Sequence, residues 1–507
     1  MADRVAAIDV GSNAIRFSAA ESAADGVQVV AETRWAVRLG RGVFTSGRIE
    51  EEDAVQAAEG LVQAARQIEE LQVRRYRAVA TSAVRDSRNR LAFVRRVRQA
   101  SGIHLEVIPG SEEIRLVHAA VRRRMSLGKD TWALVELGGG SVEIALADES
   151  RVTWNETHAM GAVRLMEMFV KGNSEPREFS RLVQEYVATL RLPGRAAERG
   201  LKGLIATGGN IESIARICRG GRGSAGPLAL PVAEVRDLVR AMAALSVEER
   251  QRKYELRPDR ADVIVPAGIV YTYLAEKLGA AEMAVPGGGV REGIMANLLE
   301  ASGLPAQAAD AGLVDDAVAL GRKFHFDETH ALHVERMALS LFDQLADLHG
   351  LGARERRMLA AAALLHDVGG FVSLKSHHKH ALYIISRSEL PGFNRREMFL
   401  VGCVARYHRK GPPTPEHREF AQLSLTDRHR VRLLAAMLRV ADALDKEHRQ
   451  KITAIAVDRA AGEVRIRASG ADDLLLEQWA LRKKDDLFRE TFGVGVSLCR
   501  NAECVDE

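Results

Sequence analysis

The chain has 507 residues, of which 47% are hydrophobic and 28% are charged, and division by the roughly 150 residues of a typical domain predicts about three globular units. No stretch is dominated by one residue type, which excludes fibrous and intrinsically disordered proteins. Lys and Arg total 72 against 68 Asp and Glu, a net charge of +4, which is too small an excess to predict a nucleic-acid partner.

The N-terminus and the cysteines favour a soluble, cytoplasmic protein. Residues 1–13 lack the apolar core of a signal peptide, and no run approaches the roughly 18 apolar residues of a membrane-spanning helix. The four cysteines are too few and too scattered for a disulfide framework, and none forms a CxxC pair. They favour a reducing compartment, and we expect no membrane partner.

Alternating strands and helices predict an α/β domain at the start of the chain. Strands 5–10 and 14–20 flank the polar turn Gly11-Ser12-Asn13 and form a hairpin. The elements expected next are a helix over 49–73, a strand over 76–81, a helix over 90–99, a strand over 104–108 and a helix over 112–125.

The hairpin occurs a second time 127 residues later. The second copy consists of strands 132–137 and 142–147 around Gly138-Gly139-Gly140-Ser141. In the two copies Asp9 aligns with Glu136, and Arg16 aligns with Glu143. A period this long indicates duplicated domain halves rather than a solenoid. Two such halves would face each other across a cleft, each presenting a carboxylate before a glycine.

Two further glycine turns follow predicted strands. Thr207-Gly208-Gly209 ends a strand that begins near 201 and precedes a helix expected from 211. Gly287-Gly288-Gly289 ends a strand that begins near 284 and precedes a helix expected over 291–299. Such turns can hold phosphate, because glycine permits close backbone approach and successive N–H groups point at the anion. A single example is commonly a plain β-turn. Four at strand ends predict a cleft for a chain of phosphates, with the binding residues Gly11, Ser12, Asn13, Gly138, Gly139, Gly140, Ser141, Gly208 and Gly209.

Charged side chains beside these turns suit the same purpose. Asp9, Glu136 and Glu143 offer the hard oxygen ligands that Mg²⁺ prefers. The alternative, solvated edge charges, is disfavoured for Asp9 and Glu136, because each ends an apolar strand. Arg16 and Arg85 suit bidentate phosphate recognition, although either could be an ordinary surface arginine.

A pair of consecutive glutamates opens the helix predicted over 112–125. In Ser111-Glu112-Glu113-Ile114-Arg115 the acidic residues favour a helix N-terminus through the helix dipole. A general base would need the same placement. No lysine follows the glycine turns in a GxxxxGK[ST] pattern, which excludes a Walker-A site.

The composition changes to small residues over 301–315, and the strand signals stop there. From 328 to about 446 the pattern is helical, and strands over 452–457, 463–468 and 494–499 with a helix from 472 indicate a small α/β tail. The domains expected are a first lobe over 1–125, a second over 126–305, a helical domain over 315–450 and a tail over 451–507.

The helical domain holds most of the histidines. His330, His366-Asp367 and Asp442 lie on separate predicted helices, and such ligands build metal sites between helices. The alternative is that the buried histidines are simply hydrogen-bonded. His377, His378 and His380, together with the run 406–410, add a cationic cluster that could hold anions or supply further metal ligands.

Five motifs in order carry a resemblance to a known family. They are Asp9-x-Gly-Ser-Asn-x-x-Arg16, Ala80-Thr-Ser-Ala-x-Arg85, Ser111-x-Glu-x-Arg115, Gly138-Gly-Gly-Ser-x-Glu143 and Thr207-Gly-Gly. From about 4 to 300 the chain resembles the exopolyphosphatase/guanosine pentaphosphate phosphatase family of the actin-like ATPase superfold. The order His, His-Asp, Asp in the helical domain resembles the HD phosphohydrolase superfamily.

The resemblance implies an α/β fold of two duplicated ribonuclease H-like lobes, followed by an all-α HD-like domain and the small α/β tail. It implies Mg²⁺, or Mn²⁺, held by Asp9, Glu136 and Glu143, with Glu113 activating water. A second divalent metal at His330, His366, Asp367 and Asp442 and a homodimer are further expectations. The chain departs from the family pattern in having Glu136 where Asp is usual, and in the glycine-rich segment 285–293.

We therefore expect a phosphohydrolase that removes terminal phosphoryl groups from inorganic polyphosphate, with the helical domain regulating the enzyme or gripping the polymer. Phosphoryl transfer needs mainly positioning and charge neutralisation, which the turns, arginines and metal would supply. The alternatives are removal of the 5′-phosphate of guanosine pentaphosphate, a nucleotide or polyphosphate regulator without turnover, and a kinase of the same superfold.

Overall fold

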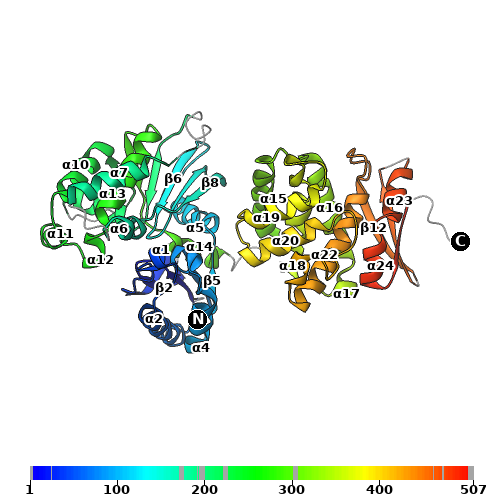
Figure 1. The fold of residues 1–507 in the computed structure, drawn as a ribbon, viewed down its shortest axis with the longest axis horizontal. Coiled ribbons are helices and arrows are strands. Elements are labelled where there is room, and N and C mark those ends of the chain that lie inside the picture. Colours follow the sequence, from blue (N-terminus) through cyan, green and yellow to red (C-terminus); the bar gives the residue numbers. More distant parts are fainter. Residues whose placement is uncertain are drawn as a thin grey trace. The chain divides into compact units, whose positions relative to one another are not determined.

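The chain forms two compact units, Met1–Pro305 and Ala306–Glu507, each drawn as a ribbon in Figure 1. The structure is a computed structural model. It describes residues 4–23, 26–170, 176–190, 192, 200–220, 226–300, 307–460, 462–470 and 473–500.

The first unit begins with a five-stranded sheet in the order β3-β2-β1-β4-β5. Its strands are β1 (Arg4–Val10), β2 (Ile15–Ala23), β3 (Gly26–Trp35), β4 (Arg75–Ala80) and β5 (Leu105–Val107). The predicted hairpin is confirmed, because β1 pairs antiparallel with β2. Helices α2 (Glu51–Glu70) and α4 (Arg90–Ser101) share a hydrophobic core with this sheet. Strand β1 is apolar on both sides because helices cover both faces of the sheet.

The second sheet repeats this arrangement and adds one strand, in the order β10-β11-β9-β6-β7-β8. Its strands are β6 (Trp132–Leu137), β7 (Val142–Ala147), β8 (Val152–His158), β9 (Leu204–Thr207), β10 (Leu228–Pro231) and β11 (Glu282–Val285). The register confirms the alignment of the two copies, since Asp9 pairs with Arg16 and Glu136 pairs with Glu143. The unit is therefore a duplication.

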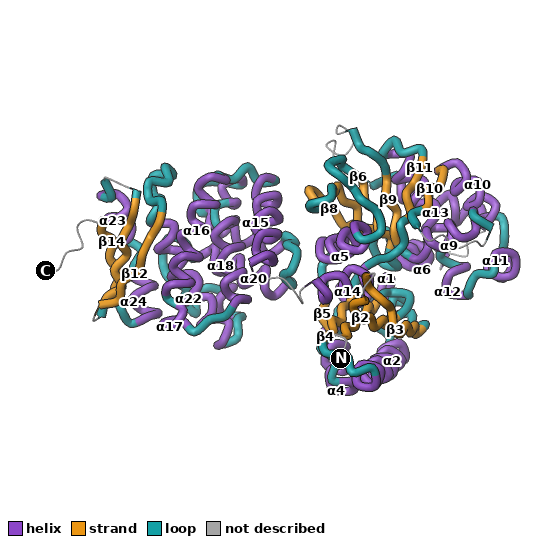
Figure 2. The backbone as a smooth tube through the Cα atoms, turned by 180° about the vertical axis from the view of Figure 1, so that it is seen from behind, coloured by secondary structure: helices purple, strands orange, loops and turns teal. Residues whose placement is uncertain are grey.

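Two helices lie between the sheets, as Figure 2 shows from behind. Helix α14 (Val290–Glu300) packs against β1 and β2, and α5 (Gly110–Arg122) packs against β7 and β8. The helices also pack on each other, and a Cβ at Gly293 would lie 1.9 Å from the carbonyl oxygen of Leu116. Only glycine permits this close crossing.

Further helices cover the second sheet and connect the lobes. They are α1 (Val43–Ser46), α3 (Ser82–Asp86), α6 (Ala162–Val170), α7 (Pro176–Val187), α9 (Gly209–Cys218), α10 (Val232–Ala243), α11 (Val247–Tyr254), α12 (Pro258–Ala261) and α13 (Ile264–Lys277). Helix α13 is buried almost along its whole length and packs against α6, α7, α9 and α10. Apart from α9, the helices of this group beyond 160 have no clear signal in the sequence, and neither do strands β3, β8 and β10.

The second unit is helical, as expected. Its helices are α15 (Gln307–Arg322), α16 (Glu328–Gln344), α17 (Ala346–His349), α18 (Ala353–Leu365), η1 (Val368–Phe371), α19 (His377–Arg387), α20 (Arg395–Arg406), α21 (Arg418–Ala421) and α22 (Leu425–Ala443). Of the stretch 301–315, where strand signals stop, residues 301–306 lie outside the described residues. Helix α15 begins at Gln307, because the alanines there favour helix.

A three-stranded sheet closes the second unit. Strands β12 (Ala454–Ala460), β13 (Glu463–Ser469) and β14 (Gly495–Arg500) pair in that order, with α23 (Leu475–Arg482) and α24 (Asp486–Phe492) between the last two. The predicted start of α23 at 472 lies outside the described residues. Residues of this sheet and of the helices belong to one continuous hydrophobic core.

No helix in the described part of the chain is long and apolar enough to cross a membrane. Cys218 and Cys403 are free thiols, whereas Cys499 is disulfide-bonded. The reducing compartment inferred from the number and spacing of the cysteines stays a prediction.

Candidate functional site

The glycine turns of the two lobes lie against each other. A Cβ at Gly139 would be 2.8 Å from the Cβ of Ser12, and one at Gly140 would be 2.5 Å from the Oγ of Ser82. The hydroxyls of Ser12 and Ser82 are 3.0 Å apart and hydrogen-bonded. Side chains at 139 and 140 would thus hold the lobes apart, and the two turns line one site.

The other predicted turn residues close these loops. The N–H of Gly11 donates to the carbonyl of Ala14 at 3.1 Å, and that of Gly138 to Ser141 at 3.0 Å. Gly208 lies beside the second turn, since a Cβ there would be 3.4 Å from the Oε1 of Glu136. All three stretches of predicted binding residues therefore meet in the first unit.

Two buried carboxylates stand side by side at the end of the second hairpin. Glu136 on β6 and Glu143 on β7 are 9% and 1% exposed. In each, the Oε2 atom has no hydrogen-bond partner among the described residues. Burial raises the pKa of Glu136 to about 8 and that of Glu143 well above its ordinary value, and the nearby Glu113 raises both further. Such a pair needs a cation in order to be ionised.

Asp9 occupies the corresponding place in the first lobe. It ends strand β1 opposite Arg16. Burial raises the pKa of Asp9, and the charges of Arg16 and Arg291 offset only part of that effect. Each lobe therefore has a carboxylate whose ionised form is destabilised by burial.

The two consecutive glutamates of α5 have different surroundings. Arg77 donates to Glu112 at 2.9 Å, and Arg115 donates to it at 2.7 and 2.8 Å. Although burial raises the pKa of Glu112, these two arginines outweigh it and bring the pKa to about 2. Glu113 instead forms an ion pair with Arg85 and acts electrostatically on Glu136 and Glu143. Glu112 is thus a structural ion-pair residue, and Glu113 is the glutamate that interacts with Glu136 and Glu143.

Arg85 is nearly buried and faces protein groups. Besides Glu113, it donates to the carbonyl of Ile108 at 3.0 Å and to the hydroxyl of Ser141 at 3.4 Å. Ser141 in turn donates to Glu143 at 2.6 Å. The arginine connects the start of α5 with the second glycine turn, and its role in phosphate binding stays a prediction.

A pair of arginines meets at the turn that follows β9. A Cβ at Gly209 would lie 2.7 Å from Nη2 of Arg260 and 3.2 Å from Nη2 of Arg16. Burial and the charge of Arg16 lower the pKa of Arg260 to about 10, so it remains a cation at neutral pH. Arg260 could not be predicted from the sequence, because nothing in its short helix α12 distinguishes it from a surface arginine.

Asn13 serves a contact between the lobes. Its amide donates to the carbonyl of Asp259 at 2.8 Å, and the carboxylate of Asp259 forms an ion pair with Arg34. A second ion pair, Arg38 with Asp262 at 2.6 Å, lies nearby. In this state of the molecule the amide of Asn13 binds protein, and its predicted contact with phosphate remains untested.

The second unit brings all four predicted histidine and aspartate residues together. His330 opens α16, where its N–H is capped by Asp327, and His366-Asp367 follow α18. The Nε2 atoms of His330 and His366 are 3.5 and 3.7 Å from Oδ1 of Asp442 on α22. The Nε2 of His366 is also 3.5 Å from Oδ2 of Asp367.

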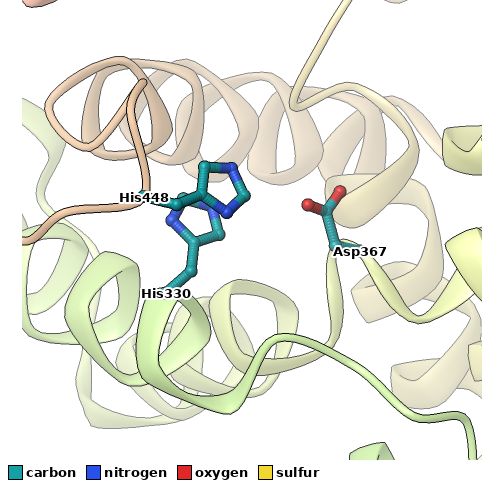
Figure 3. A group of neighbouring side chains, drawn as sticks. All are labelled: His330, Asp367 and His448. Atoms are coloured by element: carbon teal, nitrogen blue, oxygen red, sulfur yellow. The ribbon is translucent and has the colours of Figure 1, made fainter.

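Three more histidines surround this cluster. The ring of His448 stacks on that of His330 with centroids 3.6 Å apart, and Figure 3 shows both rings beside the carboxylate of Asp367. Oδ1 of Asp367 lies 3.1 Å from Nε2 of His377 and 3.5 Å from Nε2 of His408. His448 has no signal in the sequence, because it lies in the loop after α22.

Models of one protein family match both units of the chain. The model of the Ppx/GppA phosphatase family matches residues 18–302, and that of Ppx/GppA phosphatase domain III matches residues 316–490. Curated relatives include guanosine-5′-triphosphate,3′-diphosphate pyrophosphatases from Photobacterium profundum, 24% identical over 80% of both chains, and from Aeromonas hydrophila, 26% identical over 86% of both chains.

Solved structures share the fold of the first unit. An exopolyphosphatase from Cytophaga hutchinsonii is 22% identical, with a TM-score of 0.55, over 59% of this chain and 98% of its own. The Ppx/GppA protein of Aquifex aeolicus is 24% identical, with a TM-score of 0.51, over 60% of this chain and 99% of its own. The prediction of two ribonuclease H-like lobes followed by a helical region is confirmed.

Proposed function

The chain belongs to the Ppx/GppA phosphatase family, whose members hydrolyse phosphoanhydride bonds, and from that premise we propose that it removes terminal phosphate from inorganic polyphosphate at the glycine turns of the first unit. One observation carries the proposal. Glu113 forms an ion pair with Arg85, which reaches Ser141 of the second glycine turn, beside a pair of buried carboxylates that need a cation. The site therefore combines a proton acceptor with a place for metal and phosphate.

The carboxylates fit a hard divalent cation. Asp9, Glu136 and Glu143 supply only oxygen ligands, and the unpartnered Oε2 atoms of the two glutamates are buried. Mg²⁺ is bound through one or two carboxylates together with the phosphates of a substrate. Glu136 and Glu143, which are paired across β6 and β7, would hold the metal, which when bound neutralises charge on the phosphate oxygens. A part for Asp9 in binding it stays a prediction.

The residues of the chain itself supply the remaining requirements. Arg16 and Arg260 place two guanidinium groups at Gly209, where they can hold phosphate oxygens. Arg85 fixes the carboxylate of Glu113 by an ion pair, and a guanidinium beside a carboxylate favours its ionised form. An ionised Glu113 can orient a water molecule and accept its proton. Arg85 is thus assigned to positioning Glu113.

A second candidate substrate is guanosine pentaphosphate. The observation that favours it is the name of the curated relatives, which match over four fifths of their length. The same catalytic groups would serve both substrates, because each presents a terminal phosphoanhydride to the cleft.

The proposal is tested by Glu113→Gln in the full chain. We expect polyphosphate hydrolysis to fall by about 10²–10⁴-fold, with binding retained, because the amide keeps the shape but accepts no proton. Glu112→Gln is the matched control on the same helix turn, since Glu112 is engaged by Arg77 and Arg115. The Glu112→Gln variant should have a lower melting temperature than the wild type, and its turnover should be unchanged at a temperature where it remains folded.

The assays use polyphosphate, guanosine pentaphosphate and ATP, each with and without Mg²⁺. The higher kcat/KM of the first two identifies the substrate. Binding of these compounds without turnover of any of them would indicate a regulator rather than an enzyme. Wild-type turnover by Glu113→Gln would show that Glu113 is not the proton acceptor.

A further inference from the structure

We infer that a group of arginines between the two lobes of the first unit forms a second phosphate subsite, and that Asp259 occupies this subsite when no substrate is bound. The subsite consists of Arg34 on β3 and Arg257 at the start of α12, next to Arg16 and Arg260 of the proposed active site. The inference rests on the proposed function, because it concerns the phosphates that lie behind the terminal one of the same substrate.

The strand register places a carboxylate and two arginines in one row. Asp9 on β1 is paired with Arg16 on β2, and Arg16 is paired with Arg34 on β3. Directly opposite residues share a face of the sheet, and neighbouring strands lie about 4.8 Å apart, so that the row from Asp9 to Arg34 spans roughly 10 Å. The row therefore begins at a predicted metal ligand and ends at an arginine beyond the first pair of phosphate-binding arginines.

The arginines of the group act on one another. Arg16 and Arg34 are like charges on adjacent strands, an arrangement that destabilises a sheet. Burial and the charges of Arg257 and Arg16 lower the pKa of Arg34, whereas Asp259 raises it. Burial and the other three arginines lower the pKa of Arg260 to about 10. Four cations this close together favour an anion that carries more than one negative charge.

Asp259 is the anion that the protein itself supplies to this group. Its carboxylate forms ion pairs with Arg34 and, at 3.3 Å, with Arg257. The amide of Asn13 in the first glycine turn donates to the backbone carbonyl of Asp259 at 2.8 Å and lies 3.4 Å from its Oδ2. One carboxylate thus contacts donors from both lobes, and it neutralises one of the four positive charges.

Two donors of the group remain without an acceptor. The Nε atoms of Arg34 and Arg260 are buried, and they have no hydrogen-bond partner among the residues that the structure describes. The Arg260 side chain is itself buried, at 7% exposure. A buried donor on a cation is costly unless it is hydrogen-bonded, and phosphate oxygens match the geometry of a guanidinium. Asp259 therefore leaves the group incompletely satisfied, whereas phosphates would bring further acceptors.

The arrangement predicts that the site selects chains of phosphates. With the terminal phosphates held by Arg16 and Arg260 at Gly209, those behind them would meet Arg34 and would displace Asp259 from it. Pyrophosphate has a single phosphate behind the terminal one and would not span the row of roughly 10 Å. Asp259 would thus lower the affinity for every ligand that reaches the subsite.

The test measures dissociation constants by titration calorimetry in the full chain carrying Glu113→Gln, with Mg²⁺ present and phosphate release followed in parallel. The ligands are pyrophosphate, long-chain polyphosphate and guanosine pentaphosphate. Asp259→Asn should tighten the binding of long-chain polyphosphate about tenfold, because the amide keeps the shape and no longer competes for the arginines. Arg34→Ala and Arg257→Ala should weaken it about tenfold. The affinity for pyrophosphate should not change in any of these variants.

Asp262→Asn is the matched control for the contact between the lobes. Asp262 forms an ion pair with Arg38 at 2.6 Å in the same contact, and its substitution should leave all dissociation constants unchanged. Melting temperatures verify folding. Because the Arg257 side chain is 57% exposed, Arg257→Ala still tests the subsite if Arg34→Ala does not fold.

Unchanged or weaker binding of long-chain polyphosphate by Asp259→Asn, or equal tightening in Asp262→Asn, would overturn the inference. Tightening confined to guanosine pentaphosphate would support the subsite and identify its occupant as the 3′-diphosphate of that nucleotide. Failure of the proposed function has a different signature, since it would be the absence of phosphate release by the wild type, whatever the dissociation constants of the variants.

Discussion

Binding of Mg²⁺ to the first unit should weaken steeply as the pH falls below 8. Burial raises the pKa of Glu136 to about 8, so below that pH the metal must displace a proton. For this one group the apparent affinity is lower by about 11-fold at pH 7 and about 100-fold at pH 6 than for the fully ionised site. The raised pKa of Glu143 acts in the same direction.

Titration calorimetry in two buffers of different ionisation enthalpy measures both the affinity and the protons released. Release of about 0.9 proton per Mg²⁺ is expected at pH 7 from Glu136 alone, and more if Glu143 also ionises. Repeating the titration on His366→Ala separates binding in the second unit. Glu136→Gln should bind Mg²⁺ more weakly and with a shallower dependence on pH.

Equal Mg²⁺ affinity at pH 6 and pH 8 would refute this reasoning, because it would mean that Glu136 is ionised before metal arrives. The same slope in Glu136→Gln as in the wild type would refute the assignment to this residue and leave Glu143 as the titrating group.

Three further predictions concern the same unit. Without metal, the stability that the neutral form of Glu136 contributes is fully present below its unfolded pKa of about 4.3 and is lost as the pH rises through about 8. The melting temperature of the wild type, measured relative to that of Glu136→Gln, should therefore fall between pH 6 and 8. Mg²⁺ should remove this dependence of the melting temperature on pH. Arg16→Ala and Arg260→Ala should each raise KM for polyphosphate roughly ten- to hundredfold in steady-state assays, since a charge-assisted hydrogen bond contributes about 1.5–3 kcal/mol. Residues 1–305, which carry their own cores, should retain short-chain hydrolysis and process long polyphosphate poorly, as chain-length-resolved product analysis would show.

The sequence alone predicts those features that local pattern determines. The two hairpins and their turns follow from apolar runs interrupted by glycine and small polar residues, and the alignment of Asp9 with Glu136 appears in the strand register. Strand β3 escaped prediction, because its polar positions 28, 32, 33 and 34 interrupt the apolar alternation.

What the sequence does not show is which side chains meet. Glu112 and Glu113 are equivalent in the helix pattern, and only their partners distinguish them, which are Arg77 and Arg115 for the first and Arg85 for the second. Likewise, the sequence offers His377 and His408 as members of a cationic cluster that could hold anions or supply metal ligands, and it does not decide between these roles. Their approach to Asp367 depends on how α18, α19 and α20 pack, which is tertiary information.

The duplication explains the fold of the first unit, and a chemical difference between its two hairpins explains the chemistry we propose there. In both hairpins a carboxylate ends the first strand, yet its partner on the second strand is Arg16 in one lobe and Glu143 in the other. The first lobe therefore contributes a cation that reaches Gly209, and the second contributes a pair of carboxylates whose raised pKa values call for a metal. Two identical hairpins would give either two cations or two acidic pairs. A phosphate chain between the lobes needs one of each, since its oxygens bind arginine directly and bind carboxylates only through a metal ion.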